Sequence, residues 1–146
     1  MISALHQCFP LLGATTMEDA LRLEGEWPPI VFSINQTSAA DFPVCVMFDL
    51  FPGESEESIS VSHALARRFA SFFGCRALTD GSGLGDDSSP YWSIIWESGQ
   101  PLLANDCDSA LFDGVEGGLV RIARPIRYSV PDLDAAGRLV RSESHL

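Results

Sequence analysis

The chain has 146 residues, the usual size of a single domain, and its 46% hydrophobic content is enough for one packed core. It carries 20 acidic residues against 9 basic residues, all of them arginine, and therefore a formal net charge of −11. So negative a chain disfavours nucleic acids and anionic membranes as partners, because both are polyanions. The charge favours a basic partner, or it serves only to keep the protein dispersed.

The four cysteines are widely spaced and indicate no metal site. Zinc sites usually draw their ligands from closely spaced pairs, and the chain has none among Cys8, Cys45, Cys75 and Cys107. The N-terminal run MISALHQCFPLLG lacks a basic start and a continuous apolar stretch, so we expect no secretory leader. No stretch reaches the ~18 apolar residues of a membrane span. We therefore expect a cytoplasmic chain with reduced thiols and no cofactor.

The first predicted elements are a short helix and two strands. Thr15 or Thr16, followed by two acidic residues, predicts a capped helix over residues 17–23. Branched and aromatic residues predict a strand over residues 30–34 and a central strand over residues 44–51. A polar turn separates these two strands.

The clearest helix follows the acidic stretch 54–57 and ends at Gly74, a residue typical of a helix C-cap. His63 lies away from the central line of its apolar stripe. We expect the helix to pack its phenylalanines on a sheet. The stripe repeats at helical spacing and consists of Val61, Leu65, Phe69, Phe72 and Phe73.

The rest of the domain is predicted to be strands. Strands are expected over residues 75–79, 91–97, 100–104 and 119–123, with a tight hairpin turn at Ser98-Gly99. The sum is an α+β fold with a mostly antiparallel sheet of about five or six strands and one main helix packed on a face. We expect a single domain over residues 1–128 and a polar, loose tail over residues 129–146.

The most unusual segment is the loop TDGSGLGDDSSPYW, which begins at Thr79. Its three glycines resemble those of phosphate-binding loops, but two aspartates and a strand follow them instead of a helix, which disfavours a nucleotide site. On the spacing of an EF-hand, Leu84 and Tyr91 occupy positions that need oxygen ligands. An irregular calcium site on Asp86 and Asp87 stays open beside a plain surface loop, and we assign no metal ligand.

A second acidic cluster follows the hairpin. If the sheet is a meander, the loop before Tyr91 and the loop after Ala104 leave it at the same end, because the hairpin turn lies at the other end. Aromatic residues among charged groups are typical anchors of protein interfaces. Alternation does not decide whether Trp92 faces the core or the solvent. The residues predicted to bind a partner are Asp86, Asp87, Tyr91, Trp92, Asp106 and Asp108.

The cysteines, histidines and acidic residues of the chain disfavour a catalytic function. A nucleophilic cysteine needs nearby positive charge or a histidine, whereas Cys107 lies between two aspartates. None of the three histidines belongs to a recognisable nucleophile motif. The acids lack the signature of a polar cleft that a hydrolase would need. We assign no catalytic residue, and a metal-dependent enzyme is the least favoured alternative.

The run from Phe69 to Asp108, with GCRALTDGSGLGDDSSPYWSIIWESGQPLLANDCDS at its heart, resembles small bacterial proteins of the immunity type. Such proteins are encoded beside polymorphic, contact-dependent or type VI secreted toxins. The resemblance implies a cytoplasmic protein that binds and neutralises one cognate toxin. An acidic inhibitor fits a basic toxin, and charge complementarity speeds their association. The alternative is a stand-alone protein-binding or adaptor domain.

Overall fold

The computed structural model describes residues 7, 14–16, 19, 22, 30–37, 39–50, 55–111, 118–135 and 138–140. The chain forms two compact units. Unit 1 comprises residues 1–34, 46–65 and 130–146, and unit 2 comprises residues 35–45 and 66–129. Within the described residues, no helix is long and apolar enough to cross a membrane.

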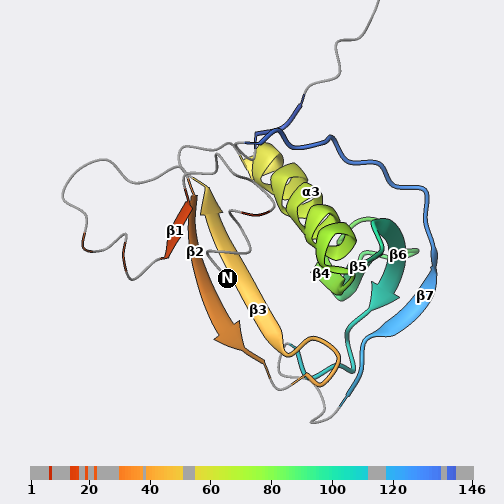
Figure 1. Ribbon diagram of the computed structural model, residues 1–146. Helices are drawn as coiled ribbons and strands as arrows, with labels where there is room; N and C mark the ends of the chain where they lie inside the picture. Colours follow the sequence, from red (N-terminus) through yellow and green to blue (C-terminus); the bar gives the residue numbers. More distant parts are fainter. Residues whose placement is uncertain are drawn as a thin grey trace, which may run out of the picture. The chain divides into compact units, whose positions relative to one another are not determined.

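A three-stranded sheet contains β1 (Ala14–Thr16), β2 (Ile30–Gln36) and β3 (Val44–Leu50), in that order. β1 runs parallel to β2, while β2 and β3 run in opposite directions (Figure 1). The two strands predicted over residues 30–34 and 44–51 are thus confirmed with small shifts of their ends. Their connecting turn is closed by a 3.0 Å hydrogen bond from the Thr37 amide to the Pro43 carbonyl.

The helix predicted over residues 17–23 lies almost entirely outside the described residues. Its cap is visible: the Asp19 amide donates to Thr16 Oγ1 at 3.1 Å, and Thr16 Oγ1 donates to the Asp19 carboxylate at 2.8 Å. This reciprocal pair satisfies a backbone N–H group that a helix start leaves without a partner. The threonine cap is therefore Thr16.

A four-stranded antiparallel sheet belongs to unit 2. Its strands lie in sequence order and are β4 (Arg76–Asp80), β5 (Trp92–Glu97), β6 (Gln100–Asn105) and β7 (Arg121–Pro125). The predicted hairpin turn between β5 and β6 is confirmed, because Ser98 and Gly99 have φ values of 50° and 78°. Two successive residues with positive φ match the right-handed twist of the flanking strands.

The strand β5 is buried on both of its faces. Ile94 and Trp96 on one face and Ile95 on the other are each at most 1% exposed. Trp96 Nε1 donates to Thr79 Oγ1 at 3.0 Å, which satisfies the indole in the core. On the Ile95 face, the apolar cluster is completed by Phe42, Leu78, Leu102, Ala104, Leu111 and Val120.

The helix α3 spans Ser55–Phe73, and Gly74 confirms the predicted C-cap with a φ of 60°. Phe72 and Phe73 are 52% and 42% exposed, so the expectation that the phenylalanines pack on a sheet is wrong for these two. His63 lies away from the central line of the predicted stripe but is nevertheless buried, at 4% exposed. Small side chains let a helix approach its neighbours closely, and alanines dominate the buried side. Among residues 59–73, whose exposure the structure describes, the buried residues of α3 are Val61, His63, Ala64, Leu65, Ala66 and Ala70.

The α+β class is confirmed, with the strands divided between two sheets. In unit 2, the part of α3 that belongs to this unit, residues 66–73, lies against the four-stranded sheet (Figure 1), and a Cβ atom at Gly99 would lie 3.6 Å from Ser71 Cβ. In the segment predicted as a loose tail, Val130 and Leu133 are buried and Leu133 forms a β-bridge with Leu139. The division into a domain over residues 1–128 and a tail stays a prediction.

Candidate functional site

The loops before β5 and after β6 meet at one end of the four-stranded sheet. Trp92 lies opposite Asn105 in the register of the two strands, and the Asp106 amide donates to the Tyr91 carbonyl at 2.9 Å. The hairpin turn at Ser98 and Gly99 closes the other end, so the expected shared end is confirmed. We call residues 81–91 and 106–109 the paired loops.

The three alternate glycines of the first loop are each required for a different reason. A Cβ at Gly81 would lie 2.7 Å from the Ser93 backbone, and one at Gly85 would lie 2.0 Å from the Trp92 indole. Gly83 has open space around it but adopts a φ of 83°, which side chains rarely tolerate. The loop therefore lies directly on β5 and on Trp92 in a specific conformation.

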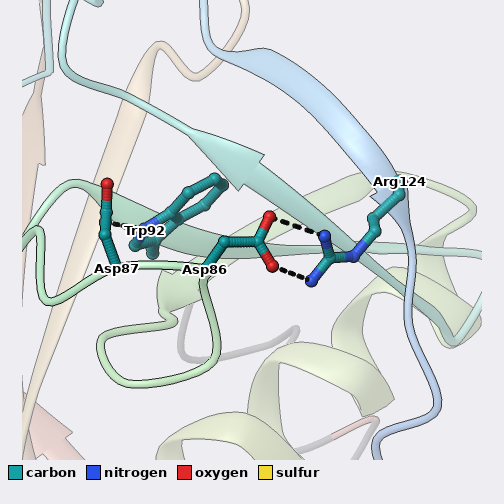
Figure 2. Close-up of polar contacts among 4 residues, drawn as sticks. All are labelled: Asp86, Asp87, Trp92 and Arg124. Carbon is teal, nitrogen blue, oxygen red and sulfur yellow. Dashed lines mark hydrogen bonds and ion pairs between the residues drawn. The ribbon is translucent and has the colours of Figure 1, made fainter.

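Asp86 is engaged by an arginine from the far edge of the sheet. Figure 2 shows its two carboxylate oxygens facing the Arg124 guanidinium, with both hydrogen bonds 2.8 Å long. These bonds and the adjacent positive charge lower the pKa of Asp86 below its usual value. The pair is at the surface, so its contribution to stability is small. It joins the glycine-rich loop to β7.

Asp87, the next residue along the loop, has a different partner and binds the tryptophan of β5. Trp92 Nε1 donates to Asp87 Oδ1 at 2.6 Å (Figure 2), and the Ser89 amide donates to the same oxygen at 3.0 Å. Both hydrogen bonds favour the ionised carboxylate and lower the pKa of Asp87. Asp87 therefore orients Trp92, which is only partly exposed.

Tyr91 is the exposed aromatic residue of the site. It is 45% exposed and stands at the entry of β5, where its carbonyl accepts the hydrogen bond from Asp106. Its amide lies 3.3 Å from Ser89 Oγ, to which it donates. The backbone of Tyr91 is thus held at both its amide and its carbonyl, while the residue remains exposed.

The two acids of the second loop have different environments. Asp108 is exposed and forms a 3.1 Å ion pair with Arg121 of β7. Asp106 is 5% exposed, and its Oδ2 accepts a short hydrogen bond from Ser93 Oγ. Burial is the main cause that raises the pKa of Asp106 above its usual value. Asp106 is therefore part of the interior, whereas Asp108 is part of the surface.

A bulge in β7 decides which acids meet the arginines. Asn105 lies opposite Arg121 and Leu103 lies opposite Arg124, which leaves Ala123 as an extra residue. Without the bulge, residues three apart in a strand would point to opposite faces. With it, both arginines share the face of Trp92.

The sequence therefore predicted that these two loops meet, but it did not predict which side chains of the sheet their acids contact. Arg121, Arg124 and Ser93 were not among the predicted site residues. The spacing of the two arginines in RIAR offered no signal for them, because only the strand register shows that they share a face. The acids that remain at the surface are Asp86, Asp87 and Asp108.

The described residues offer little for metal chemistry. No group of three or more histidine, cysteine, aspartate or glutamate side chains among them is arranged to hold a metal ion. The carboxylates of Asp86 and Asp87, where an irregular calcium site stayed open, accept hydrogen bonds from Arg124, Trp92 and Ser89.

The acidic excess is unevenly divided between the two units. Unit 1 contains 11 acidic residues against 3 arginines, a net charge of −8, while unit 2 contains 9 against 6, a net charge of −3. The paired loops belong to unit 2. Their charge is therefore a local pattern of carboxylates and arginines rather than the centre of the overall acidity.

Comparisons with known proteins found no matching family model, no matching curated protein and no matching solved structure.

Proposed function

We propose that this chain is a protein-binding module of the immunity type, which acts in the cytoplasm and neutralises a cognate bacterial toxin through its paired loops. The observation that carries this proposal is the fixed surface around Tyr91. The ring is 45% exposed, and hydrogen bonds hold its backbone at both the amide and the carbonyl. A surface that is ordered before binding loses little conformational entropy on association.

The surface carboxylates give this proposal its partner chemistry. Asp86, Asp87 and Asp108 lie on the loops that flank Tyr91, and the chain as a whole carries a charge of −11. Such a protein attracts a basic partner over long distances and orients it during the encounter. A tyrosine among carboxylates is a typical centre for an interface of this kind.

The first experiment tests toxin neutralisation. The chain is co-expressed with the secreted toxin that, for an immunity protein, is encoded beside it, and both growth and complex formation are measured. Rescued growth together with a stable complex is the expected result. If growth is not rescued and no complex forms, the immunity function is wrong. A complex with a partner that is not a toxin would instead support the alternative of an adaptor domain.

A second experiment maps the interface on that complex. We expect Tyr91→Ala to weaken the affinity by about tenfold or more, measured by calorimetry, because exposed aromatic anchors dominate interfaces. Phe72→Ala is the matched control: Phe72 is 52% exposed, and its neighbour Ser71 lies by the hairpin turn, at the opposite end of the sheet from the paired loops. Equal losses from both variants would remove Tyr91 from the interface.

The ion pair between Asp86 and Arg124 allows a test of charge at nearly constant structure. The double variant Asp86→Arg with Arg124→Asp keeps a carboxylate and a guanidinium in contact but exchanges their positions. A basic partner should bind this variant more weakly and associate more slowly at low salt, while the folding stability changes little. Unchanged association kinetics would contradict a role for the Asp86 charge.

A further inference from the structure

Asp106 occupies the place where the paired loops join. Its amide donates to the Tyr91 carbonyl, and its carbonyl accepts from the Ser109 amide, both at 2.9 Å. Its side chain accepts a hydrogen bond from Ser93 Oγ of β5. We call these three hydrogen bonds the junction. One residue thus connects the entry of β5 with the turn that follows β6.

The carboxyl group of Asp106 is poorly compensated as an anion. The residue is 5% exposed, and its Oδ1 has no hydrogen-bond partner among the described residues. Nor does any described basic side chain form an ion pair with it. Burial without a cation or a full set of donors shifts the equilibrium of a carboxyl group toward the neutral acid.

The groups around Asp106 act on this preference in opposite directions. From β4, the negative charge of Asp80 adds to it, whereas the hydrogen bond from the Ser93 hydroxyl of β5 opposes it without outweighing burial. On its own turn, Asp108 is paired with Arg121 of β7, so this arginine compensates a different acid. The pKa of Asp106 is raised accordingly, with burial as the main cause.

We propose that the protonation of Asp106 controls the junction, and we call this control the lock. The neutral side chain stays in its buried site and holds the paired loops together. Loss of its proton to bulk water loosens these loops. The sign follows from the environment. Because folding favours the protonated form, the stability from this group is complete below the ordinary pKa of an aspartate and is lost as the pH rises through the raised pKa.

The consequence for binding rests on the proposed function. A partner that needs the ordered loops should bind more tightly in mildly acidic solution than in alkaline solution. The lock itself is a property of the chain without any partner, so it is tested on the chain alone. Failure of the lock would leave the proposed function standing, and absence of a toxin complex would leave the lock standing.

The experiment is amide hydrogen exchange of the full chain across a range of pH. We expect the protection factor of the Asp106 amide to fall about tenfold between about pH 4.5 and about pH 8. In Asp106→Asn, which keeps an acceptor for Ser93, it should change less than about twofold over the same range. The matched control Asp108→Asn removes an exposed acid of the same turn and should behave like the wild type.

Two results would overturn the lock. One is a protection factor of the Asp106 amide that has the same pH dependence in Asp106→Asn as in the wild type. The other comes from the wild type alone and does not depend on the folding of a variant: a carboxyl carbon resonance of Asp106 that titrates in the range of an ordinary aspartate.

Discussion

At the scale of single residues, the glycine-rich loop owes its shape to three positions that cannot carry a side chain for three separate reasons. Gly81 lies against the Ser93 backbone, Gly83 has a positive φ, and Gly85 lies on the Trp92 indole. Such a loop is ordered by packing and backbone geometry in addition to its hydrogen bonds. The conformation that presents its two exposed acids therefore does not depend on their hydrogen bonds alone.

The contact of Gly85 with the Trp92 indole predicts a specific effect of Gly85→Ala. The new methyl group would overlap the Trp92 indole, so the indole must move and lose its hydrogen bond to Asp87. We expect a loss of about 1–3 kcal/mol in the free energy of unfolding. The Nε1–H resonance of Trp92 in an NMR spectrum should also shift. An unmoved resonance would show that the loop does not press on Trp92.

At the scale of the elements, the strand β7 has the features of an edge strand at which a sheet ends. All five of its residues are exposed, it carries two arginines, it contains a bulge at Ala123, and Pro125 offers no N–H group. Short length, charge, bulges and proline are the features that keep an edge strand from pairing with another chain. The same bulge turns both arginines toward the paired loops, so it also shapes the site.

The helix α3 provides a prediction at the same scale. Ala70 is fully buried, whereas Phe72 is 52% exposed. Ala70→Leu should lower the free energy of unfolding by about 1–3 kcal/mol, because the close-packed side of the helix has no room for added atoms. Phe72→Ala should cost less than about 1 kcal/mol. Denaturant titration measures the free energy of unfolding of both variants. A larger loss for Phe72→Ala than for Ala70→Leu would mean that the phenylalanines belong to the buried side of the helix.

At the scale of the whole molecule, charge repulsion is the dominant electrostatic feature. The chain carries a net charge of −11, and 8 of these charges come from unit 1. Several described ion pairs lie at the surface, and such pairs contribute little to stability. Salt should therefore act mainly by screening the repulsion.

We accordingly expect salt to stabilise the protein. At pH 7, raising the NaCl concentration from about 0.02 M to about 0.5 M should raise Tm by about 3 °C, measured by differential scanning calorimetry. The effect should disappear near pH 4.4, the isoelectric point, where the net charge is zero. A Tm that falls with salt at pH 7 would mean that the ion pairs outweigh the repulsion.

The sequence by itself determined the α+β class, the hairpin at Ser98-Gly99 and the shared end of the paired loops. Each follows from a local pattern: alternation and branching for strands, two turn residues that accept positive φ, and antiparallel connectivity. The partner-binding residues stay a prediction.

Only the tertiary structure decided the pairing of Asp86 with Arg124, the burial of Asp106 and the exposure of Phe72. The pairing of Asp86 with Arg124 depends on the strand register and on one bulge in β7. The exposure of Phe72 depends on which side of α3 is buried. Such contacts join residues far apart in the chain, where no local periodicity reports which side chains will meet.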